Sequence, residues 1–285
     1  MRLNRYIYAL RHDFRIPLGP GRFLKRFVYS YLIEAGERVF LIDSGTAGAE
    51  EKIFSYLEEI GRSPDRIDTL FLTHAHPDHI GAAGVIRTVS GCRVAASGLE
   101  KRWIENVELQ KKERPVPGFD SLVAGPVSVD HALYGGERFV IGEELALEVI
   151  STPGHSPGSL SFYLSPERAL FSGDAVLMPG QLPVYTDAAA VIATIGKLQA
   201  FPEIELLLSS WDQPHRGVEV KEVLNKSRRY LFRIQAEVDR ATVTMPSPEP
   251  MELCRRMVKA LQLPPAAVNP LIARAFLSHL SGGIS

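Results

Sequence analysis

The most informative stretch of this sequence is Thr73-His74-Ala75-His76-Pro77-Asp78-His79. It places three imidazoles and one carboxylate within six residues, directly after the short apolar segment 69–72, which we expect to be a strand. Because a helix could not turn positions 74, 76, 78 and 79 to one face, these side chains can converge only from a loop at the end of that strand. Imidazole nitrogen and carboxylate oxygen together suit zinc, iron or manganese rather than calcium. The stretch therefore predicts a metal site, and a histidine-rich surface loop is the simpler alternative.

Two further motifs follow, each after an expected strand. The first is Ser151-Thr152-Pro153-Gly154-His155-Ser156-Pro157-Gly158-Ser159, in which glycine and proline on both sides fix the backbone so that the imidazole can point inward. The second is Phe171-Ser172-Gly173-Asp174, at the end of the apolar segment 168–172. Alone, each would be an ordinary turn or strand end. Their order after the first motif indicates that all three contribute to one site.

Together these motifs closely resemble those of the metallo-β-lactamase superfamily, and specifically its glyoxalase II-like hydrolases. The segment Leu41-Ile42-Asp43-Ser44-Gly45 resembles the motif that ends the second strand of that family. The resemblance covers about residues 27–215 and implies an α+β fold, a four-layer αββα sandwich with metals at one edge between its two sheets. The motifs are specific for the fold and say little about the substrate.

The resemblance also implies a role for each polar residue. A first metal would be held by His74, His76 and His155. A second would be bound by Asp78 and His79, and Asp174 would bridge both. Asp43 would fix the ligand loop from behind.

The sequence departs from the family pattern at the last ligand, normally a histidine in a turn after the final strand. Here the apolar segment 206–208 leads into Ser209-Ser210-Trp211-Asp212-Gln213-Pro214-His215. Alignment by strand end selects Trp211 or Asp212, whereas alignment by residue type selects His215. We expect His215 to be the ligand. Without it the second metal would be weak or absent, and the site could be mononuclear.

The expected function follows from the charges of the metal ions and of the carboxylates that would bind them. Two divalent ions, zinc with iron or manganese as alternatives, would share a water and lower its pKa enough to form hydroxide near neutral pH. Asp78 and Asp174 are the predicted catalytic residues, because they would orient this nucleophile and take up its proton. The chain is thus predicted to be an enzyme, a metal-dependent hydrolase that attacks a small carbonyl substrate such as a thioester, lactone or other ester.

Two other enzyme classes stay open. A nuclease or phosphodiesterase is suggested by the basic C-terminal region, where residues 216–285 carry 11 Lys and Arg against 6 Asp and Glu. No basic clamp or series of stacking aromatic residues accompanies it, so we do not expect a nucleic acid partner. A mononuclear iron dioxygenase that acts on persulfides would be favoured if His215 were not a ligand.

The chain divides by the character of its segments. Residues 1–215 mix strands and helices and form the expected catalytic domain, and residues 216–285 form a helical C-terminal extension with helices at 218–240, 249–262 and 265–280. Segment 11–25 contains prolines and glycines and is expected to be a surface loop. Its basic residues, with Arg26, either form a solvated strand edge or meet an anionic substrate. The irregular segment 111–130 is either a flap near the site or a disordered insert.

Bulk composition excludes several other classes. The net charge of −1 gives no field that would attract nucleic acid or a membrane. The two cysteines, Cys92 and Cys254, form no metal-binding pattern or disulfide framework. No signal peptide or run of about 18 apolar residues is evident, so we expect a cytoplasmic protein with a small-molecule substrate and no membrane partner. Nothing in the sequence specifies an oligomeric state.

Overall fold

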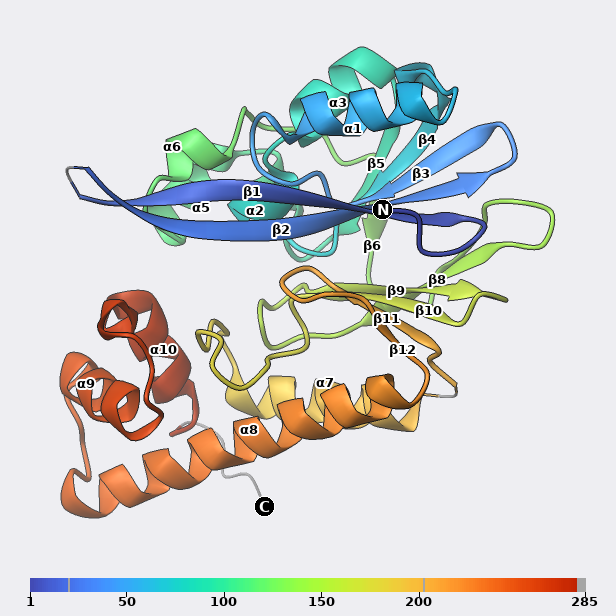
Figure 1. Cartoon of the computed structure of the whole chain (residues 1–285). Helices are drawn as coiled ribbons and strands as arrows, with labels where there is room; N and C mark the ends of the chain where they lie inside the picture. The colour runs from blue at the N-terminus through green and yellow to red at the C-terminus, as the bar shows by residue number, and fades with distance from the viewer. Residues whose placement is uncertain (20, 202, 281–285) are drawn as a thin grey trace.

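Figure 1 shows the computed structural model of the chain, which describes residues 1–19, 21–201 and 203–280. Two six-stranded sheets pack face to face, and helices cover their outer faces. The first sheet follows chain order: β1 (Ile7–Gly19), β2 (Arg22–Ala35), β3 (Arg38–Ile42), β4 (Ile67–Phe71), β5 (Arg93–Ser97) and β6 (His131–Leu133). The second has the order β12 (His215–Arg216), β11 (Leu206–Ser209), β10 (Ala169–Gly173), β9 (Leu160–Ser165), β8 (Ala146–Ser151) and β7 (Arg138–Val140).

The helices fall into two groups along the chain. Those between the strands of the first half are α1 (Ala49–Glu59), η1 (Pro64–Arg66), α2 (Pro77–Ile80), α3 (Ala83–Ser90), α4 (Lys101–Ile104), α5 (Val107–Glu113) and α6 (Phe119–Leu122). Those of the second half are α7 (Ala188–Ala200), α8 (Val218–Thr244), α9 (Pro250–Ala260), η2 (Pro265–Ala267) and α10 (Pro270–Ser278). In Figure 1, α1 and α3 lie over the first sheet, while α7 and α8 lie under the second.

The central strands are apolar on both faces because each sheet lies between two layers. On β3, Leu41 packs toward Ile53 of α1, while its neighbour Phe40 packs toward Phe162 of the second sheet. Alternate residues of one strand therefore enter different cores, as the period of two in a strand requires. The result is the αββα sandwich that the motifs predicted.

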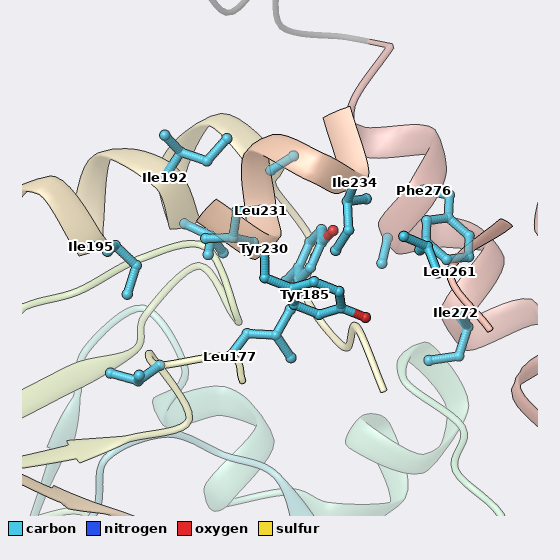
Figure 2. Packing of buried hydrophobic residues seen from close by; sticks show 14 of the residues in the cluster. Leu177, Tyr185, Ile192, Ile195, Tyr230, Leu231, Ile234, Leu261, Ile272 and Phe276 are labelled. Carbon is cyan, nitrogen blue, oxygen red and sulfur yellow. The ribbon is translucent and has the colours of Figure 1, made fainter. Parts of the chain in front are cut away.

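A third core lies between the second sheet and the C-terminal helices. It joins Leu170 and Leu207 of the sheet to Leu231 and Ile234 of α8 and to Phe276 of α10. Figure 2 shows Leu231, Ile234 and Phe276 among the side chains of this cluster. The hydrophobic core thus continues across the expected domain boundary after residue 215. After β12 the chain changes from mixed strands and helices to helices alone. The first of these helices, α8, also belongs to the helix layer that covers the second sheet.

The segment expected to be a surface loop, residues 11–25, is instead the outer part of a long antiparallel hairpin. The 13 residues of β1 pair with the 14 residues of β2, and Phe14 lies opposite Arg26. The register shifts only near Pro17, at the far end of the hairpin, where a missing N–H does least harm to the ladder. In Figure 1 the hairpin passes in front of α2, which is in contact with β2, and Arg26 on β2 lies near enough to Asp78 for their charges to interact.

Two expectations drawn from composition concern the cysteines and membrane-spanning helices. Cys92 and Cys254 are both free and buried. None of the described helices is long and apolar enough to cross a membrane.

Candidate metal centre

The three motifs meet at one edge of the sandwich. The loop that follows β4 carries His74 and His76, and the short helix α2 carries Asp78 and His79, which were expected on the loop. The turn after β8 carries His155, and Asp174 directly follows β10. Gly173 allows the two sheets to approach here, because it has a φ of 52° and a Cβ atom at this position would lie 2.9 Å from the Thr73 side chain. Ligands from both sheets therefore converge on the gap between the strand ends.

Four side chains form the first cluster. The Nε2 atom of His74 lies 2.9 Å from His76 Nδ1 and 3.1 Å from His155 Nε2. The distance between His155 Nε2 and His76 Nδ1 is 2.7 Å. Asp174 Oδ2 lies 3.4 Å from His155 Nε2 and 3.9 Å from His74 Nε2. All four ligand atoms fall within 4.8 Å of one another, so one ion between them could contact all four.

The three imidazoles of this cluster are neutral. Burial lowers the pKa of His74, His76 and His155, and the pKa values of the first two fall well below the ordinary value of 6.5. The ring of His155 donates its Nδ1 hydrogen to the Val184 carbonyl at 2.6 Å, which leaves the Nε2 lone pair directed at the centre. The lone pairs of these converging neutral ring nitrogens cannot all accept hydrogen bonds from one another. A bound cation would accept all of these lone pairs at once.

A second group of polar atoms adjoins the first. His79 Nε2 lies 3.3 Å from Asp174 Oδ1 and 3.7 Å from Asp78 Oδ2. Within the part of the chain that the structure describes, these three buried atoms have no hydrogen-bond partner. Burial and the neighbouring Asp174 carboxylate raise the pKa of Asp78 to about 6. Orphaned buried donors and acceptors are costly, so their convergence fits a second cation.

Asp43 holds the ligand loop, as the resemblance implied. Its Oδ1 atom accepts the backbone N–H of Thr73 at 2.8 Å. Its Oδ2 atom accepts the Thr73 hydroxyl and the Nδ1 hydrogen of His79, each at 2.8 Å. This contact turns the other ring nitrogen, Nε2, toward Asp78 and Asp174, so the ring is oriented for a metal. Burial opposes a charge on His79, but the carboxylates of Asp174, Asp43 and Asp78 raise its pKa well above 6.5 in the absence of an ion.

The structure does not bring His215 to the cluster, contrary to expectation. Its Nε2 atom lies 3.0 Å from Asp212 Oδ2, and its Nδ1 atom lies 3.5 Å from Glu219 of α8. The reason is strand register: His215 pairs with Leu207, which faces the helix layer rather than the space between the sheets. We leave His215 out of the proposed ligand set.

Ser210 and Trp211 directly follow β11. Burial acts to raise the pKa of Asp174, but the charge of the nearby His79, with a smaller contribution from Ser210, keeps this pKa below its ordinary value. The indole Nε1 of Trp211 is buried and has no partner among the described residues.

Glu100 and Gln110 are functional residues that sequence reasoning missed. The carboxylate of Glu100 is fully buried and accepts the N–H of Ala75 at 2.6 Å and that of Gly158 at 3.0 Å. Gln110 donates its amide to the carbonyl of Ala75. Glu100 thus ties together the two loops that carry the first cluster. In the sequence it is an ordinary acidic residue before a helix, and no local signal marks it.

Comparisons with known proteins agree with this geometry. The family model of the metallo-beta-lactamase superfamily matches residues 24–213, and the chain belongs to that superfamily. The "Probable metallo-hydrolase YqgX" of Bacillus subtilis (strain 168) is 32% identical over 199 residues, which are 68% of this chain and 87% of that protein. A hydroxyacylglutathione hydrolase of Fuscovulum blasticum is 29% identical over 148 residues, 52% of this chain and about half (49%) of its own length.

Among solved structures, a metallo-beta-lactamase family protein from Thermus thermophilus superposes with a TM-score of 0.68. The match covers 95% of this chain and 91% of the other at 20% identity, so it shows the fold alone. The fold class and family predicted from the motifs are confirmed. The chain is an enzyme of the metallo-hydrolase type with a His/Asp cluster at the predicted edge.

Proposed function

We propose that the chain hydrolyses a small carbonyl substrate, a thioester, lactone or other ester, with the help of two divalent ions. The observation that carries this proposal is the position of Asp174 between two sets of ligand atoms. Its Oδ2 atom faces His74 and His155, and its Oδ1 atom faces His79. A carboxylate that faces two such sets is the arrangement that a bridged pair of metal ions requires.

The two proposed metal sites differ in the number of their ligands. The first has four donors, namely His74, His76, His155 and Asp174. The second has three, namely Asp78, His79 and Asp174, and no histidine from the last turn reaches it in the described part of the chain. We therefore propose that zinc fills the first site more tightly than the second.

The ions would act as Lewis acids that lower the pKa of a water and polarise the scissile carbonyl. The protein would contribute orientation and proton transfer. Asp78 and Asp174 would hold the attacking water and accept its proton, because their oxygen atoms face the same small space. Asp43 and Glu100 would keep the ligand loops in place during the reaction. The glutathione thioester hydrolases among the relatives support a thioester as the first substrate to test.

A substrate panel tests this proposal. The zinc-loaded protein is assayed with a thioester, a lactone, a simple ester, a phosphodiester and RNA. We expect turnover of a carbonyl substrate that is lost in His76→Ala and retained in His131→Ala, since His131 is exposed on β6 outside the cluster. Turnover that survives His76→Ala would overturn the proposal. Cleavage of the phosphodiester or RNA alone would replace it with the nuclease function.

The position of His215 favours a second candidate, a mononuclear iron dioxygenase that acts on a persulfide. If only the first site binds metal, the chain has the ligand set of a single-ion enzyme. The test is oxygen consumption by the iron-loaded protein in the presence of a persulfide. Uptake that depends on His155, together with one iron per chain, would support this candidate, and no uptake would exclude it.

A further inference from the structure

Arg114 is a buried cation beside the metal centre. It follows α5, its side chain is 13% exposed, and its guanidinium lies 4.7 Å from the ring centroid of Trp103. Its Nη2 atom lies 2.5 Å from His76 Nε2. Its Nη1 atom is buried without a hydrogen-bond partner in the described chain, and the Glu100 carboxylate lies 3.9 Å away, beyond hydrogen-bond distance. The guanidinium is therefore held in place with donors to spare.

Metal binding would free a further donor of Arg114. His76 directs Nδ1 toward the first cluster, so as a neutral ligand it must carry its hydrogen on Nε2. That N–H would then face the Nη2 hydrogens of Arg114, which has no acceptor capacity. Two donors cannot share a hydrogen bond, so the Nη2 group would lose its hydrogen bond to His76 while the guanidinium stays stacked on Trp103. Both of its terminal nitrogens would then be available as a fork, the geometry that matches a carboxylate.

The charged groups around Arg114 and the metal centre also favour binding of an anion. Arg26 on β2 is a second cation near the site: it lies 5.1 Å from the Trp211 ring centroid, and its Nε atom lacks a partner within the described ranges. Four largely buried carboxylates, Asp43, Asp78, Asp174 and Glu100, supply four negative charges, whereas two guanidiniums and two divalent ions would supply six positive ones. Once the proposed hydroxide is included, one positive charge would remain. A substrate with a negative group would offset the excess, which is costly in a buried site.

We propose that Arg114 binds a carboxylate of the substrate, so that the enzyme selects thioesters or esters bearing a carboxylate a short carbon chain away from the scissile carbonyl. This assignment rests on the proposed hydrolysis at the metal centre. Arg114 lies one imidazole ring beyond the first metal position, a separation that such a chain can span. Tryptophan stacking restricts the guanidinium, so less side-chain freedom is lost on binding.

A matched pair of substrates tests the specificity. S-acetyl-3-mercaptopropionate carries the carboxylate, and S-acetyl-3-mercaptopropionamide is its neutral counterpart. We expect the ratio of their kcat/KM values, acid over amide, to fall about 10- to 100-fold in Arg114→Gln, whatever smaller loss the two substrates share. The matched control is Arg102→Gln, because Arg102 also stacks on Trp103 at 4.8 Å but is exposed and pairs with Glu113. Equal loss for both substrates in Arg114→Gln would mean that Arg114 only positions His76, and would overturn the proposal.

A binding measurement separates failure of this proposal from failure of the proposed function. The chain has two tryptophans, so in Trp211→Phe the fluorescence reports on Trp103 alone. We expect succinate, but not succinamide, to change that fluorescence in the zinc-loaded protein, with an apparent Kd about 10- to 100-fold higher when Arg114→Gln is added. If neither thioester is hydrolysed but this pattern holds, the carboxylate site stands and the hydrolase proposal fails. A succinate response that is absent, or independent of Arg114, would refute the site.

Discussion

Replacing Glu100 with glutamine should loosen the metal centre without touching a ligand. Glu100 accepts the N–H of Ala75, between His74 and His76, and the N–H of Gly158, three residues after His155. A glutamine side chain of nearly the same shape keeps one acceptor oxygen and presents an NH2 group in place of the other. One of the two backbone N–H groups would therefore lose its acceptor and face another donor.

The magnitude follows from this geometry. Hydrogen bonds to a charged acceptor contribute about 1.5–3 kcal/mol, and a buried donor left without a partner costs about 1–3 kcal/mol. Because these costs overlap, we expect Glu100→Gln to lower the free energy of unfolding of the metal-free protein by about 2–4 kcal/mol. We also expect zinc affinity to fall about 10- to 100-fold, as is typical when a residue that orients ligands is changed.

Urea unfolding of the metal-free protein and zinc titration against a competing chelator provide the two measurements. The matched control is Glu105→Gln, since Glu105 also accepts a backbone N–H, that of Val129 at 2.9 Å, but is partly exposed and contacts neither ligand loop. The reasoning would be refuted if Glu100→Gln unfolded within about 0.5 kcal/mol of the native protein, the usual range of surface changes, and bound zinc equally well.

Three further predictions concern four histidines, the last of which, His279, follows α10 and contacts Tyr185 and Gln235 outside the metal centre. His215→Ala should keep zinc content and turnover within about two-fold of the native values, because the partners of His215 are Asp212 and Glu219. Loss of one zinc ion in this variant would show that His215 is a metal ligand after all. His79→Ala should lower the zinc content measured by mass spectrometry from two ions toward one, whereas His155→Ala should lower occupancy of the tighter site; the reverse order would contradict the proposed ranking. Burial lowers the pKa of His279 to about 4, against about 6.5 when unfolded. The unfolded chain therefore binds more protons between these values, and stability is lost as the pH falls through this window. His279→Gln should remove on the order of 2 kcal/mol of the stability difference between pH 7 and pH 4.5, as measured by urea unfolding; an unchanged pH dependence would contradict the shift.

The sequence predicted most of the ligands because metal chemistry restricts them to a few residue types at strand ends. His74, His76 and His155 were identifiable from short motifs whose local geometry does not depend on distant contacts. The same holds for Asp174, where an apolar strand, a glycine and a carboxylate follow one another. The structure places all four of these side chains in one cluster.

The features that sequence reasoning missed depend on tertiary pairing. The face on which His215 lies is set by its register with Leu207, which the local sequence does not encode. The outer hairpin around Phe14 and Arg26 was expected to be a loop because prolines and glycines near its tip conceal the strand pattern. Glu100 and Arg114 flank short helices that bear no motif, and only the fold brings them to the ligand loops.

The central claim is that these side chains enclose divalent cations. Anomalous diffraction at the zinc edge, from crystals of the zinc-loaded protein, tests it most directly. We expect a strong peak about 2.0–2.2 Å from His74 Nε2, His76 Nδ1, His155 Nε2 and an Asp174 oxygen, with a weaker peak among Asp78, His79 and Asp174. An anomalous map without a peak between these side chains would contradict the account.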